Sequence, residues 1–111
     1  MKRGLSVCLM ATLFQFANAQ INISSTTTAY TQNFNTLATR GNSATMPAGW
    51  LLLETGANAN TTYTANAGAT TTGNTYSYGT GTAVDRALGM LGSSTLSSQV
   101  GASFRNTTGQ A

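Results

Sequence analysis

The sequence has no histidine, one cysteine and one proline among 111 residues, with five basic and two acidic side chains. A Ser-His-Asp or Cys-His catalytic arrangement requires a histidine. Structural zinc sites are built mainly from cysteine and histidine. The composition therefore excludes both kinds of site. A single cysteine, Cys8, also excludes an internal disulfide, so a folded domain must draw its stability from apolar burial and strand pairing.

The N-terminal segment has the layout of an export signal. Residues 1–3 carry two positive charges, residues 5–16 are mostly apolar, and Ala17-Asn18-Ala19 matches a small-x-small cleavage site. The apolar run is shorter than the roughly 20 residues that a membrane helix needs. We predict a signal peptide over residues 1–19, cleavage after Ala19, and a protein that is secreted or held at the cell surface.

Removal of this segment changes the charge and takes away Cys8. Three arginines and two carboxylates remain in residues 20–111, a formal charge of +1, so most of the apparent basicity belongs to the export signal. Nucleic-acid binding needs a clustered basic face. We expect no nucleic-acid partner, and no membrane span after cleavage.

The mature region, residues 20–111, reads as one all-β domain. It is rich in Thr, Asn, Ser, Gly and Ala, and aromatic residues recur along it. Thr and Tyr favour strands, and Gly or Asn clusters separate the short alternating segments, which is typical of a sandwich or barrel. We predict an antiparallel, jelly-roll-like β-sandwich with strands in INIS, GWLLLET, NTYSYG and SQVGASFR, and thin solvent-facing strands after the second of these.

Two of these segments carry specific expectations. In residues 50–53, Trp50 and Leu52 share one face and two leucines share the other, which predicts a core strand covered on both faces. Residues 99–105 alternate, which predicts that Val100, Ala102 and Phe104 point inward. A turn follows at residues 106–109 with no partner strand after it. We therefore expect the domain to continue beyond Ala111 and the strand before the turn to have an unpaired edge.

The two carboxylates of the mature region, Glu54 and Asp85, are formally a pair such as glycosidases use. We favour a structural interpretation for both, with Glu54 at a strand end and Asp85 in a polar turn. Asn58, Asn60 and Asp85 supply oxygen ligands of the kind calcium takes, but without the spacing of a calcium loop. We predict no catalytic residues, no metal and no cofactor.

Carbohydrate recognition is the binding function that the residue types allow. Sugar-binding surfaces combine exposed aromatic rings with side chains that hydrogen-bond hydroxyl groups. Trp50 lies among leucines and is assigned to the core. The candidate ligand-binding residues are therefore Tyr63, Tyr76, Tyr78, Asn60 and Arg86.

The order of several blocks resembles a bacterial extracellular module. These blocks are QNFNTLA, MPAGWLLLETG, NTTYTANAGATTTGNTYSYGTG, DRALGMLGSSTL and VGASFRNTTGQA, and the resemblance covers about residues 30–111. The chain is similar to the N-terminal β-sandwich of large secreted proteins with PEP-CTERM or type IX secretion sorting signals. The resemblance implies a jelly-roll or lectin-like sandwich with further domains downstream, and it supplies no catalytic residues.

Three functions are consistent with these features. The leading hypothesis is a non-catalytic extracellular module for surface attachment or carbohydrate recognition within a larger secreted protein, with a polysaccharide or cell-surface glycan as partner. The second is the N-terminal fragment of a secreted hydrolase or nuclease whose catalytic domain lies downstream. The third is a structural component of a surface layer or matrix.

Overall fold

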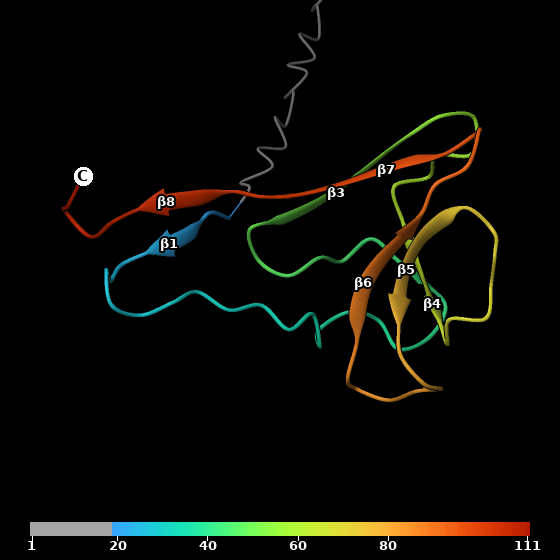
Figure 1. Ribbon diagram of the computed structural model, residues 1–111, viewed down its shortest axis with the longest axis horizontal. Helices are drawn as coiled ribbons and strands as arrows, with labels where there is room; N and C mark the ends of the chain where they lie inside the picture. The colour runs from blue at the N-terminus through green and yellow to red at the C-terminus, as the bar shows by residue number, and fades with distance from the viewer. Residues whose placement is uncertain (1–18) are drawn as a thin grey trace, which may run out of the picture.

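The computed structural model describes residues 19–111, and the predicted signal peptide lies outside these residues except for Ala19. The described chain is all-β and contains no helix (Figure 1). Accordingly, residues 19–111 contain no helix that is long and apolar enough to cross a membrane. The strands are β1 (Ile21–Ile23), β2 (Asn42–Ser43), β3 (Trp50–Thr55), β4 (Tyr63–Asn66), β5 (Asn74–Tyr78), β6 (Ala87–Leu91), β7 (Ser97–Ala102) and β8 (Phe104–Asn106).

The strands form three small sheets. One has the order β2-β4-β5-β6, and the other two are the pairs β3-β7 and β1-β8. The β3-β7 pair crosses one end of the four-stranded sheet. The β1-β8 pair continues from the β3-β7 pair, away from the four-stranded sheet (Figure 1). This arrangement confirms the prediction of an all-β, sandwich-like fold.

Two of the five strand pairs are parallel, which the sequence did not indicate. They are β1 with β8 and β4 with β5, whereas the other three pairs are antiparallel. Residues 67–73 connect β4 to β5, a shorter connection than the dozen or more residues usual between parallel strands. It suffices because β4 has only four residues, which the connecting chain can retrace at about 3.3 Å per residue. The predicted antiparallel pairing is therefore correct for three of the described pairs and wrong for these two.

The hydrophobic core lies between β3 and the four-stranded sheet. Its buried members are Leu37, Leu52 and Tyr63. Half-buried apolar side chains pack around them: Phe34, Ala38, Met46, Leu88 and Val100. The core is small, so we expect hydrogen bonding between the sheets to contribute a large share of the stability.

Strand β3 buries only one of its two apolar faces. Leu52 and Glu54 are buried, whereas Leu51 and Leu53 on the opposite face are 47% and 51% exposed. The prediction that this strand is covered on both faces is wrong for the described residues. Trp50 is half-buried, as its ring meets Phe34 edge-on at 4.9 Å and its Nε1 donates a hydrogen bond to the Tyr30 hydroxyl.

Strand β5 turns its polar face inward. Thr75 and Ser77 have no exposed surface, and Tyr76 on the other face is also buried. The prediction that this part of the chain forms thin solvent-facing strands is therefore wrong. The two hydroxyl groups can face inward because each has hydrogen-bond partners inside the fold. Thr75 donates to Glu54, and Ser77 donates to the Ala38 carbonyl and accepts from Arg86.

Strands β7 and β8 form one extended ribbon interrupted only at Ser103 (Figure 1). Val100 and Ala102 are half-buried opposite Leu52 and Trp50, as predicted. Phe104 is 51% exposed, so its predicted inward position is wrong. Beyond Ser103 the ribbon leaves β3 and pairs with β1, away from the core, and the Phe104 ring contacts Tyr30 instead.

Candidate functional site

A cavity of about 310 Å³ lies within the loop that joins β5 to β6. We name it the loop pocket. It is lined by Tyr78, Gly79, Thr80, Ala83, Asp85, Arg86 and Ala87. Tyr78 and Ala87 are the last paired residues of the two strands, so the sheet holds the rim of the pocket in place. A hydrogen bond from Ala83 N to Thr80 O forms the turn at its outer side.

Arg86 is the polar anchor of this pocket and is only 3% exposed. Its Nε donates to Ser77 Oγ at 2.9 Å, its Nη2 donates to the Ser77 carbonyl, and its Nη1 lies 3.5 Å from the Gly81 carbonyl. The contact at 3.5 Å is too long for a strong hydrogen bond. Nη1 therefore keeps donor capacity, because a guanidinium carries five N–H groups and no acceptor. None of the side-chain hydrogen bonds of Arg86 within residues 19–111 goes to a carboxylate.

Close packing explains the glycine at position 79. A Cβ at this position would collide with the Arg86 guanidinium and lie 2.6 Å from the Asp85 carbonyl. Gly79 therefore lets the backbone pass directly over the buried arginine. Its N–H donates to the Asn66 carbonyl, which ties the start of the loop to β4.

Tyr78 and Asp85 contribute the other functional groups. Tyr78 is half-buried, and its ring lies 5.3 Å from that of Tyr76 and packs against Gly89. Burial raises the pKa of Tyr78, and the nearby Tyr76 raises it further. The Tyr78 hydroxyl therefore remains protonated at neutral pH and can donate a hydrogen bond. Asp85 is exposed, and its carboxylate makes no hydrogen bond with the residues from Ala19 onward.

The structure brings together two of the five predicted site residues, Tyr78 and Arg86. Tyr63 has no exposed surface, and its hydroxyl donates to the Thr45 carbonyl and accepts from Ala38 N. A ring in that position offers no face for stacking with a ligand.

Tyr76 and Asn60, the other two, also serve the structure. Tyr76 is 4% exposed, and its hydroxyl donates to the Thr72 carbonyl. Asn60 is exposed, but its Oδ1 accepts hydrogen bonds from Thr62 within the loop after β3. Sequence reasoning did not select Asp85 or Thr80 for ligand binding. The adjacency of Asp85 and Arg86 in a glycine-flanked loop was the available signal for Asp85.

The second carboxylate, Glu54, is 5% exposed and lies apart from the loop pocket. Its Oε2 accepts from Asn60 N and Thr61 N, each at 3.0 Å, and its Oε1 accepts from Thr75 Oγ1 at 2.7 Å. Burial on its own raises the pKa of Glu54, but these hydrogen bonds outweigh it and hold the pKa below the ordinary value of 4.5. Glu54 is therefore ionised at neutral pH and its oxygens are occupied.

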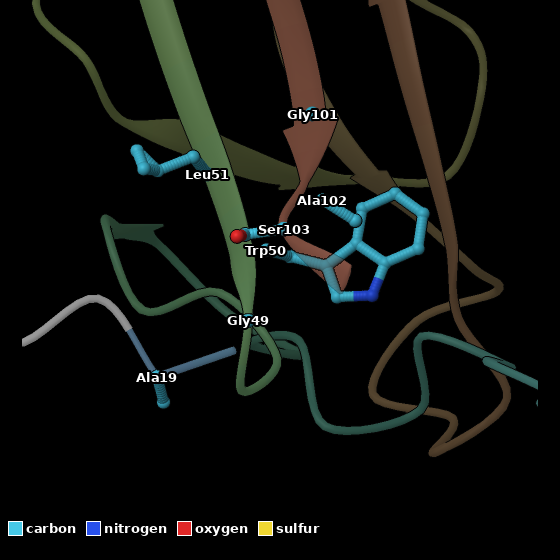
Figure 2. Close-up of a pocket in the computed structure, with 7 residues that line it drawn as sticks. All are labelled: Ala19, Gly49, Trp50, Leu51, Gly101, Ala102 and Ser103. Carbon is cyan, nitrogen blue, oxygen red and sulfur yellow. The ribbon is translucent and has the colours of Figure 1, made fainter. Parts of the chain in front are cut away.

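A larger cavity of about 430 Å³ lies on the outer face of β3 and β7 (Figure 2). It is lined by Ala19, Gly49, Trp50, Leu51, Gly101, Ala102 and Ser103. Figure 2 shows the indole of Trp50 directed to the opposite side of β3 from Leu51, so its ring does not form the wall. Among residues 19–111, small side chains and backbone make up most of the lining, and Ser103 supplies the only side-chain hydroxyl. This cavity has few groups for specific recognition of a polar ligand.

Residues 19–111 contain no cluster of three or more residues of the types that hold a metal ion. Comparisons with known proteins give no match: no protein-family model, no curated protein and no solved structure is similar to the chain. The resemblance to secreted modules with sorting signals therefore stays a prediction.

Proposed function

We propose that the chain is a non-catalytic, secreted β-sandwich module that attaches to a neutral saccharide through the loop pocket. The observation that carries this proposal is the convergence of Tyr78, Asp85 and Arg86 on one cavity. The proposal places the chain in a larger secreted protein, where it would supply attachment to a polysaccharide or cell-surface glycan.

The chemistry of the pocket favours a ligand with many hydroxyl groups. Asp85 accepts hydrogen bonds, the Arg86 guanidinium donates them, and hydroxyl groups such as those of Tyr78 and Thr80 do both. The opposite charges of Asp85 and Arg86 balance each other, which disfavours a strongly anionic or cationic ligand. The half-exposed ring of Tyr78 supplies an apolar surface of the kind that contacts the C–H face of a sugar.

The size of the pocket indicates recognition of one or two sugar rings. Its volume of about 310 Å³ lies at the lower end of the range for small-molecule sites. Affinity for a long polysaccharide would then depend on several modules acting together, as is usual for weak attachment sites.

The state of Glu54 supports a binding role over glycoside hydrolysis. Hydrolysis needs two carboxyl groups on opposite sides of the scissile bond. Glu54 is buried, hydrogen-bonded at both oxygens and absent from the lining of the loop pocket. Asp85 therefore has no partner carboxylate at this pocket.

A glycan array followed by isothermal titration calorimetry tests the proposal. We expect at least one neutral glycan to bind, and Asp85→Asn to weaken its binding about tenfold because a charge-assisted hydrogen bond is lost. Tyr78→Phe should weaken binding about fivefold through loss of one neutral hydrogen bond. Tyr30→Phe, which removes an exposed tyrosine hydroxyl outside the pocket, is the matched control and should leave the affinity unchanged.

Two results would reject the proposal. One is the absence of binding to every glycan on the array at concentrations where the protein remains folded. The other is a glycan that binds wild type, Asp85→Asn and Tyr78→Phe with the same affinity, which would place its site elsewhere.

A further inference from the structure

Within residues 19–111, the ribbon of β7 and β8 has a long edge without a partner strand. Ser103 donates to the Gly49 carbonyl and accepts from Ile21 N, and Thr107 donates to the Ile23 carbonyl. Because backbone groups alternate between the two edges of a strand, the odd-numbered residues from 97 to 105 bond to β3 and β1. The N–H and C=O groups of the even-numbered residues face the other edge: Ser98, Val100, Ala102, Phe104 and Asn106.

This edge has few of the features that prevent strand addition. The ribbon contains no proline, and its only charged residue is Arg105. Natural edge strands that stay unpaired carry lysine, proline, bulges or inward charges, or they are very short. Here the ribbon runs from residue 97 to residue 106 and, in Figure 1, extends away from the four-stranded sheet.

We propose that a second copy of this chain pairs with the edge, antiparallel, about a two-fold axis at Ala102. This register uses the whole ribbon, with position 98 opposite 106 and 100 opposite 104. Two hydrogen bonds at each of five residue pairs give about ten new backbone hydrogen bonds. The contact is isologous and closes on itself, so it produces a dimer and not a polymer.

The side chains are compatible with this self-pairing. Phe104, which is 51% exposed, meets the half-buried Val100 of the second copy, an aromatic and β-branched pair of the kind that stabilises sheets. On the outer face Gly101 meets Ser103, and Arg105 meets the neutral Gln99. No like charges oppose each other. The outer face beside the axis is open, since a Cβ added at Gly101 would meet no atom within 4 Å apart from its chain neighbours.

A pair of opposite charge changes at Gln99 tests this register. Gln99 is exposed, and it lies six positions before Arg105 in its own chain, or about 20 Å away at the usual rise per residue. This exceeds the screening length of about 8 Å at physiological salt. In the proposed dimer, by contrast, each position 99 lies directly opposite Arg105 of the other copy.

Sedimentation equilibrium on the purified chain should show a reversible dimer. Gln99→Glu should lower its dissociation constant about 2- to 30-fold, and Gln99→Lys should raise it by a similar factor, because two cross-strand charge pairs change at once. The effect should shrink at high salt. Thr71→Glu and Thr71→Lys, in the exposed loop before β5, are matched controls and should leave the dissociation constant unchanged.

A backbone variant provides a second test. Ala102→Pro removes an N–H that faces the open edge and makes no bond within the described chain, so it should abolish dimers while circular dichroism still shows a folded monomer. If Ala102→Pro does not fold, the charge variants decide alone.

Four results would overturn the proposal. They are a wild-type monomer at the highest soluble concentration, polymers that grow with concentration, a dissociation constant unmoved by either charge change, and a shift in the same direction for Gln99→Glu and Gln99→Lys. A folded Ala102→Pro variant that still dimerises would overturn it as well.

Discussion

The Glu54 carboxylate joins the loop after β3 to the inner face of β5, and its replacement tests how the two layers are held together. Its oxygens accept three hydrogen bonds, two from the backbone N–H groups of Asn60 and Thr61 and one from Thr75. Thr75 Oγ1 also lies 2.8 Å from Ser98 Oγ of β7. A hydroxyl has one proton and a carboxylate only accepts, so Thr75 donates to Glu54 and Ser98 supplies the proton of the other bond.

Glu54→Gln and Glu54→Ala should differ in a defined way. The glutamine oxygen can still accept from the two backbone N–H groups, so the loss is that of the charge, about 1–2 kcal/mol of unfolding free energy. Alanine leaves three donors without an acceptor in a nearly buried position, and we expect a cost of about 3–5 kcal/mol. For a domain of this size the glutamine variant should melt about 4–16 °C below wild type.

The stabilisation of the fold by Glu54 should depend on pH, in a direction that follows from its pKa. The pKa of Glu54 in the folded chain lies below its ordinary value of 4.5, so the ionised form favours folding. Its contribution is complete above the unfolded pKa and is lost as the pH falls through the folded pKa. The difference in unfolding free energy between wild type and Glu54→Gln should therefore shrink below about pH 4.5. Thermal melts by circular dichroism at several pH values measure it, and a difference that is absent at pH 7 or that widens in acid would refute this reasoning.

Two further predictions concern the core. Leu52→Ala should lower the free energy of unfolding by about 2–5 kcal/mol, because it leaves an internal cavity. Leu51→Ala, on the exposed face of the same strand, should lower it by less than about 0.5 kcal/mol. Equal losses in urea unfolding would contradict the burial of a single face. Tyr63→Phe leaves the Thr45 carbonyl and the Ala38 N–H without their partner, and it should cost about 1–3 kcal/mol. A Tyr63→Phe variant as stable as wild type in the same urea assay would show that these two bonds are replaced by water.

The alternation of side chains predicted the strands well but did not decide which faces are buried. The segments around residues 50–55, 74–78 and 97–102 are strands, as the sequence indicated. Periodicity places Leu51 and Leu53 on one face of the strand and Trp50 and Leu52 on the other. Because both faces are apolar, periodicity alone does not show which face is buried. The inner face is the one that carries Glu54, since its hydrogen-bond partners lie on β5 and in the loop after β3.

Polar residues misled the sequence analysis because their burial depends on distant partners. Thr75 and Ser77 belong to a segment predicted to form thin solvent-facing strands, but Glu54 and Arg86 satisfy their hydroxyl groups inside the fold. Arg86 was predicted to bind a ligand, and the structure adds that Ser77 holds its guanidinium while the Gly81 carbonyl lies near Nη1. These partners are nine and five residues away, respectively, and periodicity carries no information about such contacts.

The most direct test of the proposed function is a ¹⁵N NMR titration of the chain with the tightest-binding glycan from the array. We predict that the largest amide shift changes fall on residues 78–87, which form and flank the loop pocket, with little change over β1 and β8. Shift changes concentrated instead around Leu51 and Gly101, or spread evenly over the sheet, would contradict it.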